Sequence, residues 1–176
     1  MLRRKYWMLM RLLPPLLWFV ALAAVAPPVA ADTTRLDSAS SDGVLMIQAA
    51  PGVLHFHPDP EHTDYSWLVG AEWLYSSRWL AGFSYFNNSF GQKSQYYYGG
   101  RWWRISESDP NWYFKLTAGV IAGYKQPYED KIPYNHNGIA PGIIPAIGYQ
   151  VNRFNIQLNF LGTSALMVTV GYDLIR

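Results

Sequence analysis

The sequence contains no cysteine, so neither a disulfide framework nor a thiolate metal site is available to it. Beyond residue 31, no stretch approaches the roughly 18 consecutive apolar residues that a membrane-spanning helix requires. Past residue 43, glycine or proline interrupts every apolar stripe with helical i, i+3, i+4 spacing. These absences exclude a disulfide-stapled fold, a multi-span helical membrane protein and a helix bundle.

The first 31 residues have the layout of an export signal. A basic start is followed by the apolar centre "LLPPLLWFVALAAV" and by the small residues Val29-Ala30-Ala31. An uncleaved membrane anchor is the alternative, but the two prolines and the small residues at the end of the segment favour cleavage. We therefore predict a cleaved signal peptide over 1–31, followed by a polar segment over 32–43.

Positive charge is also scarce once the signal is removed. The signal contains four basic residues and no acidic residue. The chain after residue 31 therefore keeps 10 of the 14 lysines and arginines and all 12 acidic residues, which gives a formal net charge of −2. A nucleic-acid partner therefore has no electrostatic support. Aromatic residues, in contrast, are abundant, since 12 of the 13 tyrosines and 6 of the 8 tryptophans remain.

Period-2 alternation is the main pattern of the remaining chain. In the segment "RFNIQLNFLG", Phe154 and Ile156 fall on one face of a strand, and Asn155 and Gln157 fall on the other. A soluble sandwich also alternates, but its polar face usually carries charges. Here the polar face is mostly uncharged amide, hydroxyl and glycine, which suits the lumen of a barrel.

Eight such segments are recognisable between turn clusters. They cover 44–57, 64–75, 79–88, 95–105, 111–124, 139–149, 153–161 and 165–175. An exported chain with eight alternating segments and aromatics near the strand ends is typical of an outer-membrane β-barrel. In lipid, closure is required because every backbone polar group must be bonded internally. We predict an all-β, eight-stranded antiparallel transmembrane barrel over 44–176.

The predicted sixth strand, "GIAPGIIPAIGY", is apolar on both faces and contains Pro141 and Pro145. Proline removes a ladder donor, so the two prolines predict a local gap in strand pairing. The apolar residues on both faces predict that part of the lumen is apolar. Together they favour a barrel that admits an acyl chain sideways from the bilayer. The alternative is a twist at Pro145 and a lumen plugged by side chains.

Strand direction places polar residues at one rim. If both termini are periplasmic, the first strand ends outward at "HFHPD" and the third at "FNNSF", which brings His55 and Ser89 to the same outer rim. An imidazole that removes a hydroxyl proton is a component of acyl transfer. A purely structural role for either residue is the alternative. We expect His57, His62 and His136 to be solvated loop histidines.

The residues also resemble a known family. The segments that carry the resemblance are, in order, "LHF", "SRWLAGFSYFNNSF", "YYYGGRWW", "FKLTAGVIAG" and "IIPAIGY". Their order and spacing over about residues 52–175 are similar to the PagP-type lipid A palmitoyltransferases of Gram-negative outer membranes.

The resemblance implies a palmitoyl transfer from the sn-1 position of an outer-leaflet phospholipid to a hydroxyacyl chain of lipid A, with the acyl chain in an apolar lumenal pocket. The family's catalytic histidine, aspartate and serine correspond to His55, Asn88 and Ser89. Its acyl-pocket floor corresponds to Gly100, and one of its lateral openings corresponds to Pro145. The resemblance further implies a monomer with the site facing the cell exterior, and no cofactor or metal.

The chain departs from the family in three places. Asn88 stands where the family has aspartate, so either it serves by hydrogen bonding alone or Asp59, Glu61 or Asp64 takes the acidic role. The segment 32–43 is too short and polar for the family's amphipathic helix, and the chain ends in "DLIR" without a terminal aromatic. Two rival functions stay open: a non-enzymatic lipid-binding barrel, and a lipid A deacylase, whose His-x-Ser-Asn signature is absent.

Overall fold

Antiparallel strands make up most of the part of the chain that the structure, a computed structural model, describes: residues 43–57, 59–63 and 65–175. The expected signal peptide and all but the last residue of the polar segment lie outside these residues. The strands are β1 (Val44–Ala50), β2 (Leu54–His55), β3 (Trp67–Leu74), β4 (Trp79–Asn87), β5 (Lys93–Arg104), β6 (Trp112–Ala122), β7 (Ile139–Val151), β8 (Phe154–Leu161) and β9 (Ala165–Ile175). No helix in the described residues is both long and apolar enough to cross a membrane.

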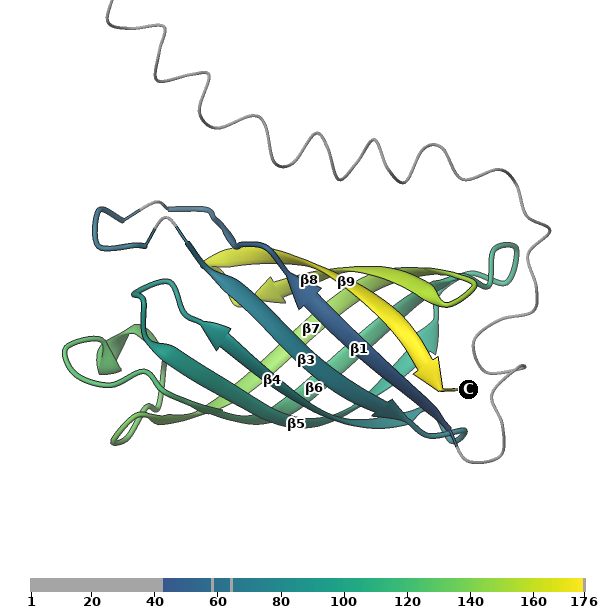
Figure 1. Cartoon of the computed structure of the whole chain (residues 1–176), viewed down its shortest axis with the longest axis horizontal. Coiled ribbons are helices and arrows are strands. Elements are labelled where there is room, and N and C mark those ends of the chain that lie inside the picture. Colours follow the sequence, from purple (N-terminus) through teal and green to yellow (C-terminus); the bar gives the residue numbers. More distant parts are fainter. Residues whose placement is uncertain (1–42, 58, 64, 176) are drawn as a thin grey trace, which may run out of the picture. The chain divides into compact units, whose positions relative to one another are not determined.

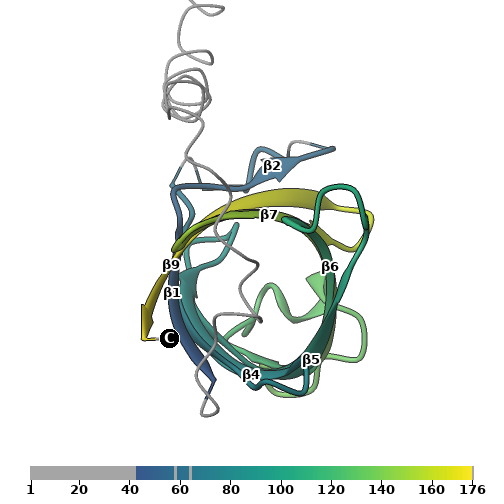
Figure 2. The same ribbon diagram turned by 90° about the vertical axis from the view of Figure 1, so that its right-hand side faces the viewer.

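The sheet closes on itself. Each long strand pairs with its sequence neighbour in antiparallel register, and β9 returns to pair with β1. Viewed along the axis, the strands form a closed ring (Figure 2). The prediction of an eight-stranded antiparallel barrel is therefore confirmed, with eight long wall strands in the described residues and the two-residue β2 as an addition.

The first predicted strand, 44–57, is wrong as a continuous element. The β1–β3 ladder ends at the pair Ala50–Leu68, directly before Pro51. Proline has no N–H to donate, so the ladder cannot continue through it. The chain turns aside and forms β2, which pairs with β9 through Leu54–Leu166 and His55–Ala165. This break decides where His55 lies.

The two faces of the wall match the sequence alternation. Asn155 and Gln157 are buried in the lumen, whereas Phe154 and Ile156 are exposed on the outside. Rings on neighbouring strands pair near the strand ends, as interfacial girdles of a barrel do. These pairs are Trp67–Tyr85, Trp103–Phe114, Trp112–Tyr149 and Phe154–Tyr172.

The two ends of the barrel differ in their connections (Figure 1). The turns 75–78, 105–111 and 152–153 form one end, here called the short-turn end. The connections 56–66, 88–92, 123–138 and 162–164 form the other, here called the long-loop end. The 3₁₀ turn Glu129–Lys131, labelled η1, belongs to the loop 123–138. β2 is too short to cross a membrane and belongs to the long-loop end.

Polar side chains fill the middle of the lumen. Lys115 Nζ lies 2.8 Å from Glu72 Oε2, and both side chains are almost fully buried. The Tyr98 hydroxyl donates to the same Glu72 oxygen at 3.1 Å and accepts from Gln48 Nε2 at 2.9 Å. These contacts satisfy Glu72 Oε2 and offset part of the desolvation cost of the buried pair, whereas Oε1 of the same carboxylate has no hydrogen-bond partner among the described residues. We call these four buried residues, Gln48, Glu72, Tyr98 and Lys115, the polar layer.

Candidate functional site

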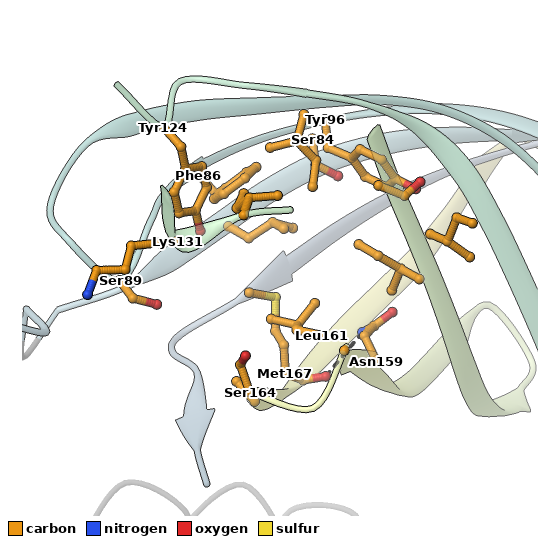
Figure 3. A pocket seen from close by; sticks show the side chains of 18 of the residues that line it. Ser84, Phe86, Ser89, Tyr96, Tyr124, Lys131, Asn159, Leu161, Ser164 and Met167 are labelled. Carbon is orange, nitrogen blue, oxygen red and sulfur yellow. Dashed lines mark hydrogen bonds between the residues drawn. The ribbon is translucent and has the colours of Figure 1, made fainter. Parts of the chain in front are cut away.

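A cavity of about 950 Å³ reaches from the long-loop end into the lumen (Figure 3). Its walls are largely apolar, and Gln48, Tyr98 and Lys115 of the polar layer lie at its deep end. The apolar lining includes Leu68, Phe86, Tyr96, Ile121, Ile144, Leu161 and Met167. Figure 3 shows Ser89 and Lys131 on one side of this space, and Leu161, Ser164 and Met167 on the opposite side. The apolar lumen expected from the sixth predicted strand is therefore present in the half nearest the long loops.

His55 and Ser89 meet at the mouth of this cavity. His55 Nε2 and Ser89 Oγ are 2.7 Å apart, although 34 residues separate them in sequence. β2 places the histidine, because its pairing with β9 continues in the bond from the Phe56 N–H to the Ser164 carbonyl at 2.9 Å. The serine carbonyl accepts from the Thr63 N–H at 2.7 Å, which ties the two loops together.

Asn88 has its polar groups engaged inside its own loop. It is 2% exposed, and its Oδ1 accepts from the backbone N–H of Phe90 at 3.0 Å and of Gln92 at 2.9 Å. Its Nδ2 donates to Ser94 Oγ at 3.1 Å. An asparagine side chain that bonds backbone N–H groups a few residues ahead fixes a turn. Asn88 therefore shapes the loop that presents Ser89, and its participation in catalysis stays a prediction.

His62 covers the ring of His55. The two ring centroids are 4.0 Å apart with an interplanar angle of 30°, and the edge of His62 also meets the Phe90 ring at 5.2 Å. The expectation that His62 is a solvated loop residue is wrong, since it is half-buried in this cluster. Burial first, and the charge of His62 second, lower the pKa of His55 below its ordinary 6.5. His55 is thus held as the free base near neutral pH.

Asp59, one of the acids proposed as substitutes for the family's aspartate, uses its carboxylate for partners other than His55. Asp59 Oδ1 accepts the Glu61 N–H at 2.9 Å, and its Oδ2 lies 3.9 Å from Lys131 Nζ. Among the described residues, no carboxylate hydrogen-bonds His55. Asp64, the third candidate, lies outside the described residues.

Gly100, expected at the floor of the acyl pocket, does not line the cavity. It faces the lumen in register with Leu80 and Thr117, and a Cβ built on it would lie 3.0 Å from Thr117 Cγ2. The methyl group of Thr117 occupies that space, and Thr117 lines the cavity instead. Gly100 is therefore not part of the cavity wall.

Pro145 marks the end of a ladder, as the two prolines of this strand predict. β7 pairs with β6 along nearly its whole length, but its pairing with β8 covers only Ala146 to Val151. The last pair is Ala146–Asn159, so residues 139–145 have no ladder partner on the β8 side. This gap opens toward the long-loop end beside the cavity-lining residues Ile144 and Leu161.

Sequence reasoning missed the cluster around Phe90. Its ring stacks on Tyr128 at 4.3 Å, and Lys131 Nζ lies 5.5 Å from its centroid. These residues come from different loops, and no local periodicity relates them. Among the described residues, no group of three or more His, Asp or Glu side chains is arranged to hold a metal ion.

The fold and this site define a transmembrane β-barrel of the eight-stranded, outer-membrane type with a lumenal cavity beneath a His–Ser pair. A designed transmembrane β-barrel matches it with a TM-score of 0.52 and 17% identity, over 77% of this chain and 99% of that one. The outer-membrane protein Ail of Yersinia pestis, solved in a phospholipid nanodisc, matches with a TM-score of 0.39 and 13% identity, over 75% of this chain and 99% of Ail. No protein-family model matches the sequence, and no curated protein does.

Proposed function

We propose that the protein is an outer-membrane acyltransferase that moves a palmitoyl chain from a phospholipid to lipid A. The observation that carries the proposal is the 2.7 Å contact between His55 Nε2 and Ser89 Oγ at the mouth of an apolar cavity. A neutral histidine within hydrogen-bond distance of a hydroxyl is the arrangement that general-base acyl transfer needs. The resemblance of the sequence to PagP-type enzymes supports the same reaction.

The cavity fits the acyl chain of the donor. Burying a hydrocarbon chain stabilises the complex by about 0.8 kcal/mol per CH₂ group, so an apolar lumen is a suitable binding site. The incomplete β7–β8 ladder offers a lateral entrance that avoids pulling the chain through water. Short turns in such barrels face the periplasm, so the long-loop end, with His55 and Ser89, faces the cell exterior.

In the proposed step, a hydroxyl of a lipid A acyl chain attacks the ester carbonyl of the donor. His55 Nε2 accepts the proton of that hydroxyl as the new C–O bond forms. The tetrahedral adduct then collapses, and the lysophospholipid oxygen leaves with the proton from His55. Before the step, the Ser89 hydroxyl orients the imidazole by donating to Nε2. When the lipid A hydroxyl takes that place at Nε2, the Ser89 hydroxyl turns and donates to the developing oxyanion. An acyl-enzyme on Ser89 would use the same contact, and the intact mass of the protein incubated with donor alone distinguishes the two routes.

Mass spectrometry of lipid A from cells with and without this protein tests the proposal. We expect one added palmitoyl group, and we expect His55→Ala or Ser89→Ala to abolish it while the barrel still folds by heat-modifiable electrophoretic mobility. His136→Ala is the matched control, because His136 belongs to the loop 123–138 and does not line the cavity. If both His55→Ala and Ser89→Ala still add palmitate to lipid A, the assignment of these two residues to the active site is wrong.

The same measurement separates the rival functions. Loss of an acyl chain from lipid A would indicate a deacylase. Unchanged lipid A, together with lipid that copurifies with the barrel, would indicate a non-enzymatic lipid-binding protein. The proposed reaction needs only the two lipids as partners, in a monomer, and no cofactor.

A further inference from the structure

His62 makes the closest ring contact to the proposed catalytic base. Its centroid lies 4.0 Å from that of His55, and the 30° interplanar angle sets the two rings nearly face to face. The edge of His55 is left for its bond to Ser89 Oγ. A flat partner on one face limits how far the His55 ring can rotate away from Ser89.

The position of His62 is itself fixed. The ring Nδ1 of His62 accepts a hydrogen bond from the backbone N–H of Asp59 at 3.3 Å, and the backbone N–H of His62 donates to the Asp59 carbonyl at 2.9 Å. Its ring makes a T-shaped contact with the ring of Phe90, and Phe90 in turn stacks on Tyr128. Three segments of the long-loop end therefore hold one imidazole against His55.

We propose that His62 is a positioning residue for His55: its ring, stacked on one face of the His55 imidazole, holds the base against Ser89. This inference rests on the proposed function. Among the described residues, the titratable groups around His62 include His55, Asp59, whose backbone N–H bonds Nδ1 of His62, and, across Phe90, Lys131. Asp59 and Lys131 lie 3.9 Å apart and partly neutralise each other.

Two substitutions separate the positioning role from simple packing. His62→Ala removes the ring, so we expect transfer to fall by roughly 10²-fold, the effect of a misplaced catalytic group. His62→Phe keeps a flat aromatic ring against His55, so we expect the rate at neutral pH to be largely retained. In both variants the pKa of His55 rises because the His62 charge is gone, and the acid limb of the pH profile moves to higher pH. His136→Ala is again the control, because His136 is exposed and does not line the cavity.

The coupling of the two rings is measured without turnover by a ¹⁵N NMR titration of the imidazoles in full-length protein in detergent micelles. We expect His62→Phe to raise the pKa of His55, because the charge of His62 lowers that pKa in the wild type. The proposal is overturned if His62→Ala keeps both the wild-type rate and the wild-type pH profile. It is also overturned if Ala and Phe lose activity equally. If His62→Phe raises the pKa of His55 but the wild-type protein transfers no acyl chain, the proposed function is wrong, whereas the interaction between the two rings is confirmed.

Discussion

Replacing Asn88 with alanine is expected to release the loop that carries Ser89. The side chain makes three hydrogen bonds within the loop and its flank, to the N–H groups of Phe90 and Gln92 and to Ser94 Oγ. At about 1 kcal/mol net for each bond, the variant loses roughly 3 kcal/mol of loop stability. Since ~1.4 kcal/mol corresponds to a factor of ten, the open loop becomes about 10²-fold more populated relative to the closed one.

Amide hydrogen exchange of the folded barrel in micelles measures this change directly. The amides of Phe90 and Gln92 should lose about 10²-fold in protection, because the Asn88 oxygen is their acceptor. Palmitoyl transfer should fall in parallel, since Ser89 is held near His55 only when the loop is closed. The thermal unfolding of the barrel should change little, because β4 and β5 keep their ladder.

Asn87 provides the matched control. It neighbours Asn88 in the sequence, but its side chain bonds the Tyr65 carbonyl at 2.8 Å and Lys93 Nζ at 3.1 Å. Asn87→Ala should leave the amides of Phe90 and Gln92 protected. Wild-type exchange rates at these two amides in Asn88→Ala would refute the reasoning, whatever the activity of the variant.

Three further outcomes are expected. Transferase activity should stay level as the pH falls to 6.5 and decline only below it, because His55 acts as a free base and burial lowers its pKa from that ordinary value; an acid limb above 6.5 would contradict this. Changing Pro141 and Pro145 to alanine restores two backbone N–H donors on β7. If the acyl chain enters beside β7, palmitoyl transfer should slow, while the melting temperature of the barrel stays the same or rises. An unchanged transfer rate would argue against lateral entry. Lys115→Met should destabilise the barrel by about 3–5 kcal/mol because Glu72 is left buried without its partner, and adding Glu72→Gln should recover most of the loss in a denaturant titration.

Much of the barrel was predictable because its signals are local. The alternation of Phe154, Asn155, Ile156 and Gln157 assigns each residue to the outer face or the lumen from a period of two alone. The ladder gap beside Pro145 follows from one chemical fact, the missing N–H of proline. The same fact at Pro51 also ended a strand, but the apolar residues on both sides of it concealed the break.

The sequence by itself determined the strand number, the two faces of the wall and the rim that receives His55 and Ser89. Only the tertiary structure decided the 2.7 Å contact between them, the loop bonds of Asn88 and the stacking of His62 on His55. It also decided that Thr117, and not Gly100, lines the cavity. These features join residues that are distant in sequence, so they depend on strand register and on side-chain volumes across the lumen, which no local period encodes.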